Sequence, residues 1–464
     1  MRGCPDARGG QPRSAAANSA RRIWFDAPRN GKLGERVSIR GLAFRAALRT
    51  RSRTVLLAIL ALLALGCAGR AHLIRDDLTA KNLEALVDSD AARGLLADLL
   101  ARRSVDARLT ALAPRVAAPD VVRESGTSRD DQPAWREQAR LRELSQEVSL
   151  DFAALSFARA ISADRVSRAV QASFHRFLQD GVADAEQSLR RPGAFPYTVL
   201  FAPSWMYRSH PETGADFAYQ RRLLDRLGIV NRLIGSRQDA SVEDNAGAIA
   251  AAVRAEKRDG KGLVVVSASK SGAEAALALS RVLAPEQSAP VVAWINIVGA
   301  LAGSPLADTA LRPPTSWVAR SVFWLRGWDW AGMISMATEA SRERLRAARM
   351  PASIAVVNVV AVPLSGTVGA TVWWGYKILR RHGPNDGAVL LAETVWPGGI
   401  NIAAIGPDHL FAPREDEAHS LAMLRAIAVA IQLHRLPSEE AAVLVGSKPG
   451  QGVEFGMSED GVNR

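Results

Sequence analysis

Cysteine is nearly absent from this chain of 464 residues, which contains Cys4 and Cys67 and no other cysteine. Because both lie within the first 67 residues, an internal disulfide framework cannot stabilise the rest of the chain. The seven histidines do not combine with these cysteines in a zinc-type spacing. The sequence therefore predicts a globular part that is stabilised by packing, with no metal site and no cofactor.

Net charge is nearly absent outside the N-terminus, although the whole chain has a formal net charge of +12. Residues 1–53 contain 13 Lys and Arg against 3 Asp and Glu, whereas the remaining residues contain 46 against 44. A nearly neutral remainder offers no general attraction to phosphate backbones. We therefore expect no nucleic-acid partner.

One apolar run, VLLAILALLALG at 55–66, follows four arginines between positions 45 and 53 and is itself followed by Cys67. It is shorter than the roughly 20 apolar residues that span a bilayer, and its flanks are those of a signal peptide. The string LALGC resembles the lipobox of bacterial lipoproteins. That resemblance implies removal of residues 1–66, lipidation of Cys67, and a lipid-anchored protein on a membrane of the bacterial cell envelope. An uncleaved membrane anchor and an ordinary secreted form are the alternatives.

The chain after the predicted signal peptide shows two different patterns of apolar residues. Residues 67–190 carry Leu, Ala and Val at three- and four-residue spacing, which predicts a helical N-terminal region. Residues 191–436 alternate helical stretches with short β-rich runs, and this pattern predicts a three-layer α/β domain around a mostly parallel sheet. The expected strands are YTVLFA, RLIGS, GLVVVSA, PVVAWINIV, SIAVVNVVAV and INIAAIG. Residues 437–464, rich in Gly, Ser and Glu, are expected to form a flexible tail.

The segment GLVVVSASKSG places an apolar strand almost directly before a helical stretch. In a nucleophile elbow, a serine occupies the apex of a strained strand-to-helix turn, and the residues two before and two after it must be small. Ser267 and Ser271 meet this requirement on either side of Ser269. The pattern predicts Ser269 as a nucleophile; a serine-rich turn that only caps the helix is the alternative.

A base and an acid follow Ser269 in the sequence. His409 lies in INIAAIGPDHLFAP, in a turn that follows an apolar strand, so its ring is expected at the C-terminal edge of the sheet. Asp386, in RRHGPNDGAV, precedes it by 23 residues and is expected to orient the imidazole and stabilise the imidazolium. Asn-Asp-Gly is also an ordinary turn signal. The chain order Ser269, Asp386, His409 is that of an α/β-hydrolase triad.

Acyl transfer also needs two backbone N–H groups that stabilise the oxyanion. The residue after the nucleophile supplies one such group, which assigns the Lys270 amide to this role. The loop after an early strand usually supplies the other, and YTVLFAPSWMY favours the Trp205 amide.

Residues 196–431 resemble bacterial lipases of the α/β-hydrolase superfamily. The resemblance rests on the elbow, on INIVGALAGSPLAD after it, and on the acid loop GPNDGAV. The sequence departs from the family at FAPSW, where His-Gly is usual, and at the two elbow serines. The resemblance implies a serine hydrolase of carboxylic esters, with a lipid or small ester as substrate. An acyltransferase with the same triad and a non-catalytic envelope scaffold are the alternatives.

Tryptophan is concentrated in the segment TSWVARSVFWLRGWDWAGMISM, within a predicted aromatic cap at about 311–350. Trp324 and Trp328 are expected to shield an acyl-binding cleft there, and simple packing of the cap against the core is the alternative.

Overall fold

The computed structural model describes residues 83, 85–112, 134–256, 260–411 and 416–436. These residues belong to one compact unit, Gly66–Arg464. The predicted signal peptide, its lipidation candidate Cys67 and the predicted tail lie outside the described residues. What the sequence predicts for those segments stays a prediction.

Within the described residues, six parallel strands form one sheet in the spatial order β2-β1-β3-β4-β5-β6. Most of these strands are nearly continuous runs of Val, Ile, Leu and Ala, because helices bury both faces of a parallel sheet. In β3, Val264 and Val266 face one helical layer, whereas Leu263 and Val265 face the other. The strands are β1 (Tyr197–Ala202), β2 (Asn231–Leu233), β3 (Gly262–Ala268), β4 (Val291–Ile297), β5 (Ala355–Val362) and β6 (Ile400–Ile405).

One face of the sheet packs against α6 (Arg165–Phe177), α7 (Val182–Leu189), α8 (Ala218–Leu227) and α17 (Glu417–Arg435). The helices α6 and α17 lie against each other and share one apolar core with the strands. Each begins at an aspartate whose carboxylate accepts a backbone N–H of the first turn, which stabilises the helix start. Although α6 belongs to the predicted N-terminal helical region, it therefore contributes directly to the core around the sheet.

The opposite face packs against α9 (Val242–Ala255), α10 (Lys270–Leu277) and a π-helical turn (Ala278–Val282), and α11 (Pro285–Ser288) packs against α9. Alanines on α9 and α10 let these helices approach each other and the sheet closely. The indole rings of Trp294 and Trp396 meet edge to face in this layer, with centroids 5.7 Å apart. This layer holds the helix that follows the nucleophile candidate.

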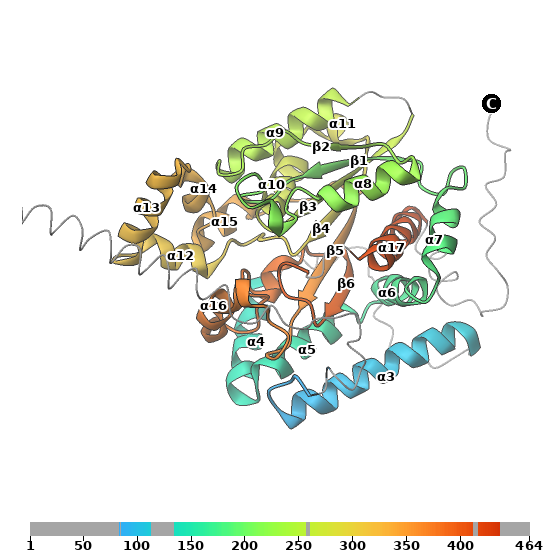
Figure 1. The fold of residues 1–464 in the computed structure, drawn as a ribbon, viewed down its shortest axis with the longest axis horizontal. Coiled ribbons are helices and arrows are strands. Elements are labelled where there is room, and N and C mark those ends of the chain that lie inside the picture. Colours follow the sequence, from blue (N-terminus) through green and yellow to red (C-terminus); the bar gives the residue numbers. More distant parts are fainter. Residues whose placement is uncertain (1–82, 84, 113–133, 257–259, 412–415, 437–464) are drawn as a thin grey trace, which may run out of the picture. The chain divides into compact units, whose positions relative to one another are not determined.

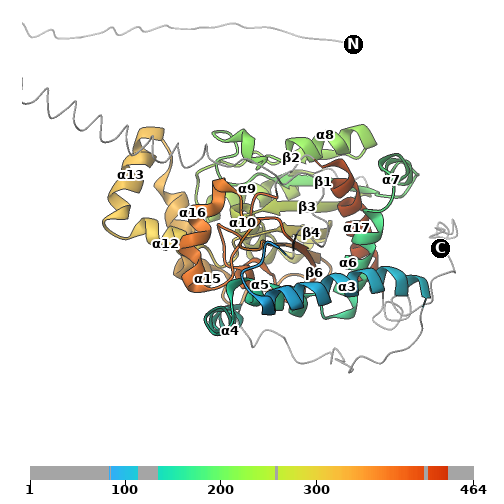
Figure 2. The same cartoon turned by 60° about the horizontal axis from the view of Figure 1, so that its bottom comes forward.

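Further helices flank the sheet. Figure 2 shows α3 running along α5, and both pack near the strand β6. The helices α12 to α15 connect β4 to β5, and α16 follows β5. None of the helices in the described residues is long and apolar enough to cross a membrane. The flanking helices are α3 (Asp90–Leu112), α4 (Ala134–Glu147), α5 (Leu150–Ile161), α12 (Pro305–Leu311), α13 (Thr315–Arg326), α14 (Trp330–Ser335), α15 (Thr338–Leu345) and α16 (Ala370–Leu379), with 3₁₀ turns at Pro211–Thr213, Arg380–His382 and Leu391–Thr394.

The predicted three-layer α/β architecture around a parallel sheet is confirmed, and each of the six predicted strand segments overlaps a strand. The strand β2 begins one residue before RLIGS and ends at Leu233, because it pairs with β1 through only these three residues. Short edge strands leave few unpaired backbone groups exposed.

The order of the strands also creates a crevice. The strand β1 lies between β2 and β3. From β1, the chain adds β2 on one side of the sheet and then β3 to β6 on the other. Parallel α/β sheets bind ligands outside the carboxyl ends of the strands at such a switch point. The loop after β1 and the turn after β3 both emerge there.

Candidate active site

Ser269 forms the connection between β3 and α10, with a backbone φ of 53° and ψ of −124°. A non-glycine residue adopts these angles only where its surroundings impose them. Its N–H donates to the Ile297 carbonyl at 3.0 Å, and its own carbonyl accepts the N–H groups of Gly272 and Ala300 at 2.9 Å each. Neighbouring segments therefore hold Ser269 at the apex of a strained turn.

The turn is tight because α10 approaches the end of β4 very closely. A Cβ atom on Gly272 would lie 2.5 Å from the Cα of Gly299, and one on Gly299 would lie 1.9 Å from the Asn296 side chain. Both distances are impossible for a side-chain carbon. Only glycine at these two positions allows the backbones to come this close, so the start of α10 lies directly against the end of β4.

The two serines at the usual glycine positions of the turn are fully buried and hydrogen-bonded. Trp294 Nε1–H donates to Ser267 Oγ at 2.8 Å. Ser271 Oγ donates to the Ala202 carbonyl at 2.8 Å and accepts the Ala268 N–H at 2.9 Å. Their departure from glycine therefore adds buried polar contacts without opening the turn.

Ser269, His409 and Asp386 form a continuous hydrogen-bonded chain. His409 Nδ1 lies 2.7 Å from Asp386 Oδ2, and His409 Nε2 lies 2.9 Å from Ser269 Oγ. Because a carboxylate accepts but does not donate, Nδ1 carries the proton and Nε2 is the acceptor that faces the serine hydroxyl. The tertiary structure thus brings together three residues that are up to 140 positions apart.

The Asp386 carboxylate is fully buried and fixed by its own turn. Its Oδ1 accepts the N–H groups of Ala388 at 2.9 Å and Val389 at 2.8 Å, which leaves Oδ2 for the imidazole. The N–H of His409 donates to the carbonyl of Asp386 at 2.9 Å. A backbone hydrogen bond and a side-chain hydrogen bond therefore both hold Asp386 next to His409.

Electrostatics around His409 favour the imidazolium. Burial lowers the pKa of His409, but the charge of Asp386, its hydrogen bond to the ring and the charge of Asp408 outweigh that effect. The pKa of His409 consequently lies above its usual value. The site can hold the proton that a serine would release on attacking a carbonyl.

Two amides are available for an oxyanion. Lys270 is the first residue of α10, so its N–H has no acceptor within the helix. In the described part of the chain, the N–H groups of Ser204 and Met206 bind carbonyls, whereas that of Trp205 between them has no such partner. Ser269 and Trp205 line the same cavity. These are the two amides that the sequence assigns to the oxyanion.

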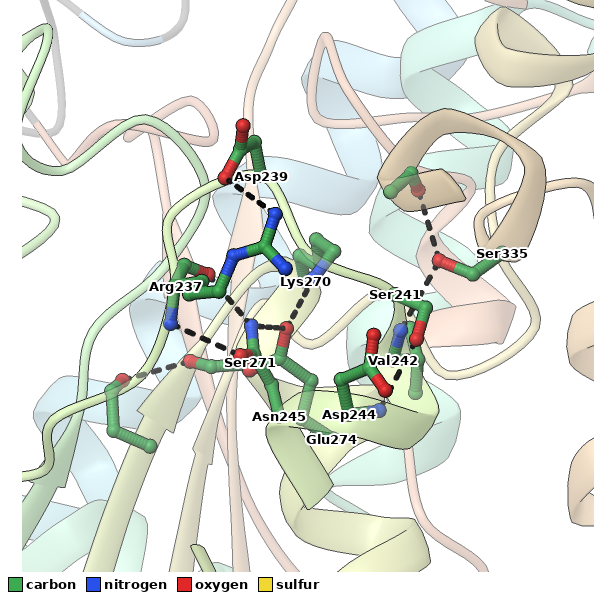
Figure 3. A network of polar contacts seen from close by, with 12 residues as sticks. Arg237, Asp239, Ser241, Val242, Asp244, Asn245, Lys270, Ser271, Glu274 and Ser335 are labelled. Carbon is green, nitrogen blue, oxygen red and sulfur yellow. Dashed lines mark hydrogen bonds and ion pairs between the residues drawn. The ribbon is translucent and has the colours of Figure 1, made fainter. Parts of the chain in front are cut away.

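The side chain of Lys270 has a second environment that sequence reasoning missed. It is buried behind the elbow and forms an ion pair with buried Glu274, which also accepts a hydrogen bond from Asn245 Nδ2 at 2.9 Å (Figure 3). Burial raises the pKa of Glu274, opposed mainly by the charge of Lys270 and its hydrogen bond. The Lys-x-x-x-Glu spacing across one helical turn was the available signal.

A cavity of about 870 Å³ opens beside Ser269 and His409. It extends between the sheet and the layer formed by α6, α8 and α17, and most of its wall is apolar. Its lining includes Phe201, Phe217, Leu224, Met423 and Ile427. Its size falls within the usual range for small-molecule sites.

The aromatic cap contacts the cavity wall through Phe323, whose ring meets that of Trp205 edge to face with centroids 6.3 Å apart. Trp324 and Trp328 do not line this cavity, and the Trp324 side chain is 83% exposed. Trp328 packs edge to face against Phe323, with ring centroids 5.5 Å apart. The structure thus places neither tryptophan in the wall of the cavity beside Ser269, and their role in shielding an acyl-binding cleft stays a prediction.

Within the residues that the structure describes, no group of three or more His, Cys, Asp or Glu side chains could hold a metal ion.

Comparison with known proteins gives similarity at the level of the fold. No family model matches the sequence, and no curated protein matches it. The metagenomic carboxyl esterase MGS0156 is 20% identical, with 51% of this chain and 76% of that chain covered and a TM-score of 0.42. The mature Bacillus licheniformis lipase BlEst2 is 21% identical (48% and 88% covered; TM-score 0.40). Esterase B of Lactobacillus rhamnosis is 16% identical (54% and 81% covered; TM-score 0.30). These three solved structures, to which this chain is similar, are two esterases and a lipase.

Proposed function

We propose that the protein is a serine hydrolase that cleaves carboxylic esters through an acyl-enzyme. The observation that carries this proposal is the chain of hydrogen bonds from Asp386 through His409 to Ser269, at the apex of a strained strand-to-helix turn. A structural serine does not require an imidazole fixed by a buried carboxylate. That arrangement is the one that makes a serine hydroxyl nucleophilic.

In the proposed reaction, Ser269 Oγ attacks the carbonyl carbon of the ester while His409 Nε2 takes the hydroxyl proton. The amides of Lys270 and Trp205 stabilise the oxyanion of the tetrahedral intermediate. When the carbon–oxygen bond to the alcohol breaks, His409 gives its proton to the leaving oxygen. Water then attacks the acyl-enzyme with His409 again as base, and this step releases the acid and restores Ser269.

The proposed substrate is lipid-like. Support comes from the apolar cavity beside Ser269, whose volume accommodates a long acyl chain, and from the scarcity of charge on its walls. Each buried methylene contributes about 0.8 kcal/mol, so an apolar wall of this extent favours long chains over acetyl groups.

The test is reaction of the purified protein with a fluorophosphonate probe, followed by peptide mass spectrometry. We expect covalent labelling at Ser269 and none in the Ser269→Ala variant, with Ser280→Ala as a matched control that still labels. A wild-type protein that folds but is not labelled would instead favour the non-catalytic scaffold. Product analysis with added alcohols separates the hydrolase from an acyltransferase, which would form a new ester.

We also propose that the mature protein begins at lipidated Cys67 and is anchored to a membrane of the bacterial cell envelope. The support is the arginine-flanked apolar run that ends in LALGC. Mass spectrometry of envelope-extracted protein tests this. An unlipidated peptide that continues upstream of Leu65 would exclude it.

A further inference from the structure

The helix α13 carries apolar side chains on the face that it turns to solvent. Trp317 is 67% exposed and Leu325 is 65% exposed, and Val318 and Trp324 lie beside them on the same helix. The two pairs of positions are seven residues apart, which is about two helical turns, so all four side chains lie on the same side of the helix. Soluble proteins rarely expose large apolar side chains together unless the surface meets a partner or a membrane.

A second helix extends the same surface. The helix α16 exposes Trp373 and Trp374, the latter 63% exposed. Both α13 and α16 pack against α12, and Figures 1 and 2 show the two helices at the same end of the sheet. We refer to the exposed apolar and basic residues of these helices as the α13/α16 face: Trp317, Val318, Arg320, Trp324, Leu325, Arg326, Trp373, Trp374 and Lys377.

The charge on this face has one sign. Neither helix contains Asp or Glu, and none of its three cations pairs with a carboxylate among the described residues. The cations lie over aromatic rings instead: Arg320 over Trp330 at 5.3 Å, Arg326 over Trp328 at 5.5 Å, and Lys377 over Trp373 at 5.0 Å. Their charges remain available to an anionic partner.

We propose that the α13/α16 face docks onto the surface of a bilayer that contains anionic lipids. Tryptophan accumulates at the level of lipid headgroups, and a helix that lies on a membrane combines apolar side chains with Lys and Arg. The observed mixture of indoles, aliphatic side chains and unpaired cations fits that environment. A symmetric contact with a second copy fits less well, because it would place the same cations against one another.

The helix α16 of this face also contacts the loops of the candidate active site. The residue before α16, Gly369, donates its N–H to Asp408, next to His409, at 2.9 Å. Within the helix, a Cβ on Gly375 would lie 2.0 Å from the carbonyl of Gly387, next to Asp386. The helix therefore packs directly on the loops that carry the base and the acid, so a lipid surface at α16 would lie near Ser269.

A local fluorescence measurement tests the proposal without relying on catalysis. In the chain from residue 67 onward with Cys67→Ser, which lacks the apolar run at 55–66, one cysteine is introduced by Ser321→Cys, on the exposed side of α13, and is labelled with an environment-sensitive nitrobenzoxadiazole dye. The matched control carries Gln187→Cys on α7, an exposed position at the opposite side of the view in Figure 1. With phosphatidylcholine vesicles containing phosphatidylglycerol, we expect a blue shift and brightening at position 321 and no change at position 187.

The charge and indole contributions can be measured separately. Removing one basic residue by Arg326→Gln should weaken partition into these vesicles about fivefold, and Trp317→Ala with Trp374→Ala should weaken it roughly tenfold or more. Circular dichroism establishes that each variant is folded. If the chain binds vesicles but the dye at position 321 stays in water, another segment is the anchor and the proposal is wrong. A spectral change that depends on protein concentration without vesicles would assign the face to a second copy and would overturn it as well.

Discussion

Ser271 Oγ donates a hydrogen bond to the carbonyl of Ala202 at 2.8 Å, and this contact joins the ends of β1 and β3. The same oxygen accepts the N–H of Ala268, one residue before Ser269. A side chain at a position where glycine is usual therefore links the two strand ends from which the nucleophile and the oxyanion loop emerge.

Replacing Ser271 with Ala should lower the free energy of unfolding by about 1–3 kcal/mol, because the Ala268 N–H and the Ala202 carbonyl lose a buried partner. Urea denaturation measures the change. Ser321→Ala removes a serine hydroxyl that bonds a carbonyl on the exposed side of α13 and should cost less than about 0.5 kcal/mol. Equal losses in the two variants would mean that the link between the strands is not stabilising.

The pH dependence of ester hydrolysis should report the environment of His409. Since an imidazolium cannot accept the serine proton, activity should fall as the pH drops through a pKa above 6.5. Asp408→Asn removes one of the charges that raise this pKa, so the acid limb of kcat/KM should move to lower pH. Asp184→Asn, on an exposed part of α7, serves as the control. An acid limb that Asp408→Asn leaves in place would contradict the assigned cause.

The buried pair of Lys270 and Glu274 should behave cooperatively. Lys270→Met leaves a buried carboxylate without its cation and should cost about 3–5 kcal/mol near neutral pH. The loss should shrink as the pH is lowered, because protonation removes the unpaired charge. Adding Glu274→Met should recover much of the loss, since Asn245 keeps its hydrogen bonds to Arg237. Denaturation of the single and double variants at pH 5 and pH 8 measures this, and additive losses would contradict the coupling.

Asp151 should make stability depend on pH between about 4 and 6. Burial, then the charge of Asp88, raises the pKa of Asp151 from 3.8 to about 6. The folded state thus binds the proton more tightly, so stability that is fully present below pH 3.8 is lost as the pH rises toward 6. The change is about 3 kcal/mol.

Unfolding experiments across that range test the effect. Asp151→Asn should flatten the decline, although it also disturbs the hydrogen bonds that Asp151 accepts from Ser365 and Asp88. The exposed control Asp90→Asn should keep the wild-type slope. Parallel curves for the wild type and Asp151→Asn would show that another group titrates.

The cavity makes a prediction about acyl-chain length. Ser420 lines the cavity on α17, whereas Gln432 is exposed on the same helix and does not line it. Ser420→Trp should impair long p-nitrophenyl esters while sparing the acetate, and Gln432→Trp should change neither. If four methylenes lose burial, the cost is about 3 kcal/mol, or roughly two hundredfold in kcat/KM. If Trp328→Ala alters the chain-length profile instead, the acyl chain lies under the aromatic cap.

Local sequence was sufficient to predict the strands and the turn after β3. A strand of a parallel sheet is buried on both faces, so runs such as GLVVVSA are apolar along their whole length and are visible without tertiary information. The small residues on either side of Ser269 can also be recognised from the sequence, because backbone crowding at the turn excludes larger side chains. The residues Asp386 and His409 follow from their positions after later strands.

Only the tertiary structure decided which surfaces of these elements meet. The helical pattern of α6 predicts a helix, but its packing beside α17 in the central core depends on segments about 250 positions apart. The tryptophans of α13 are apolar in any context, and the structure alone turns Trp324 outward and forms the cavity on the side of α8 and α17. Periodicity along a chain specifies an element and its apolar stripe, whereas the partner of that stripe is set by contacts that distant segments make on folding.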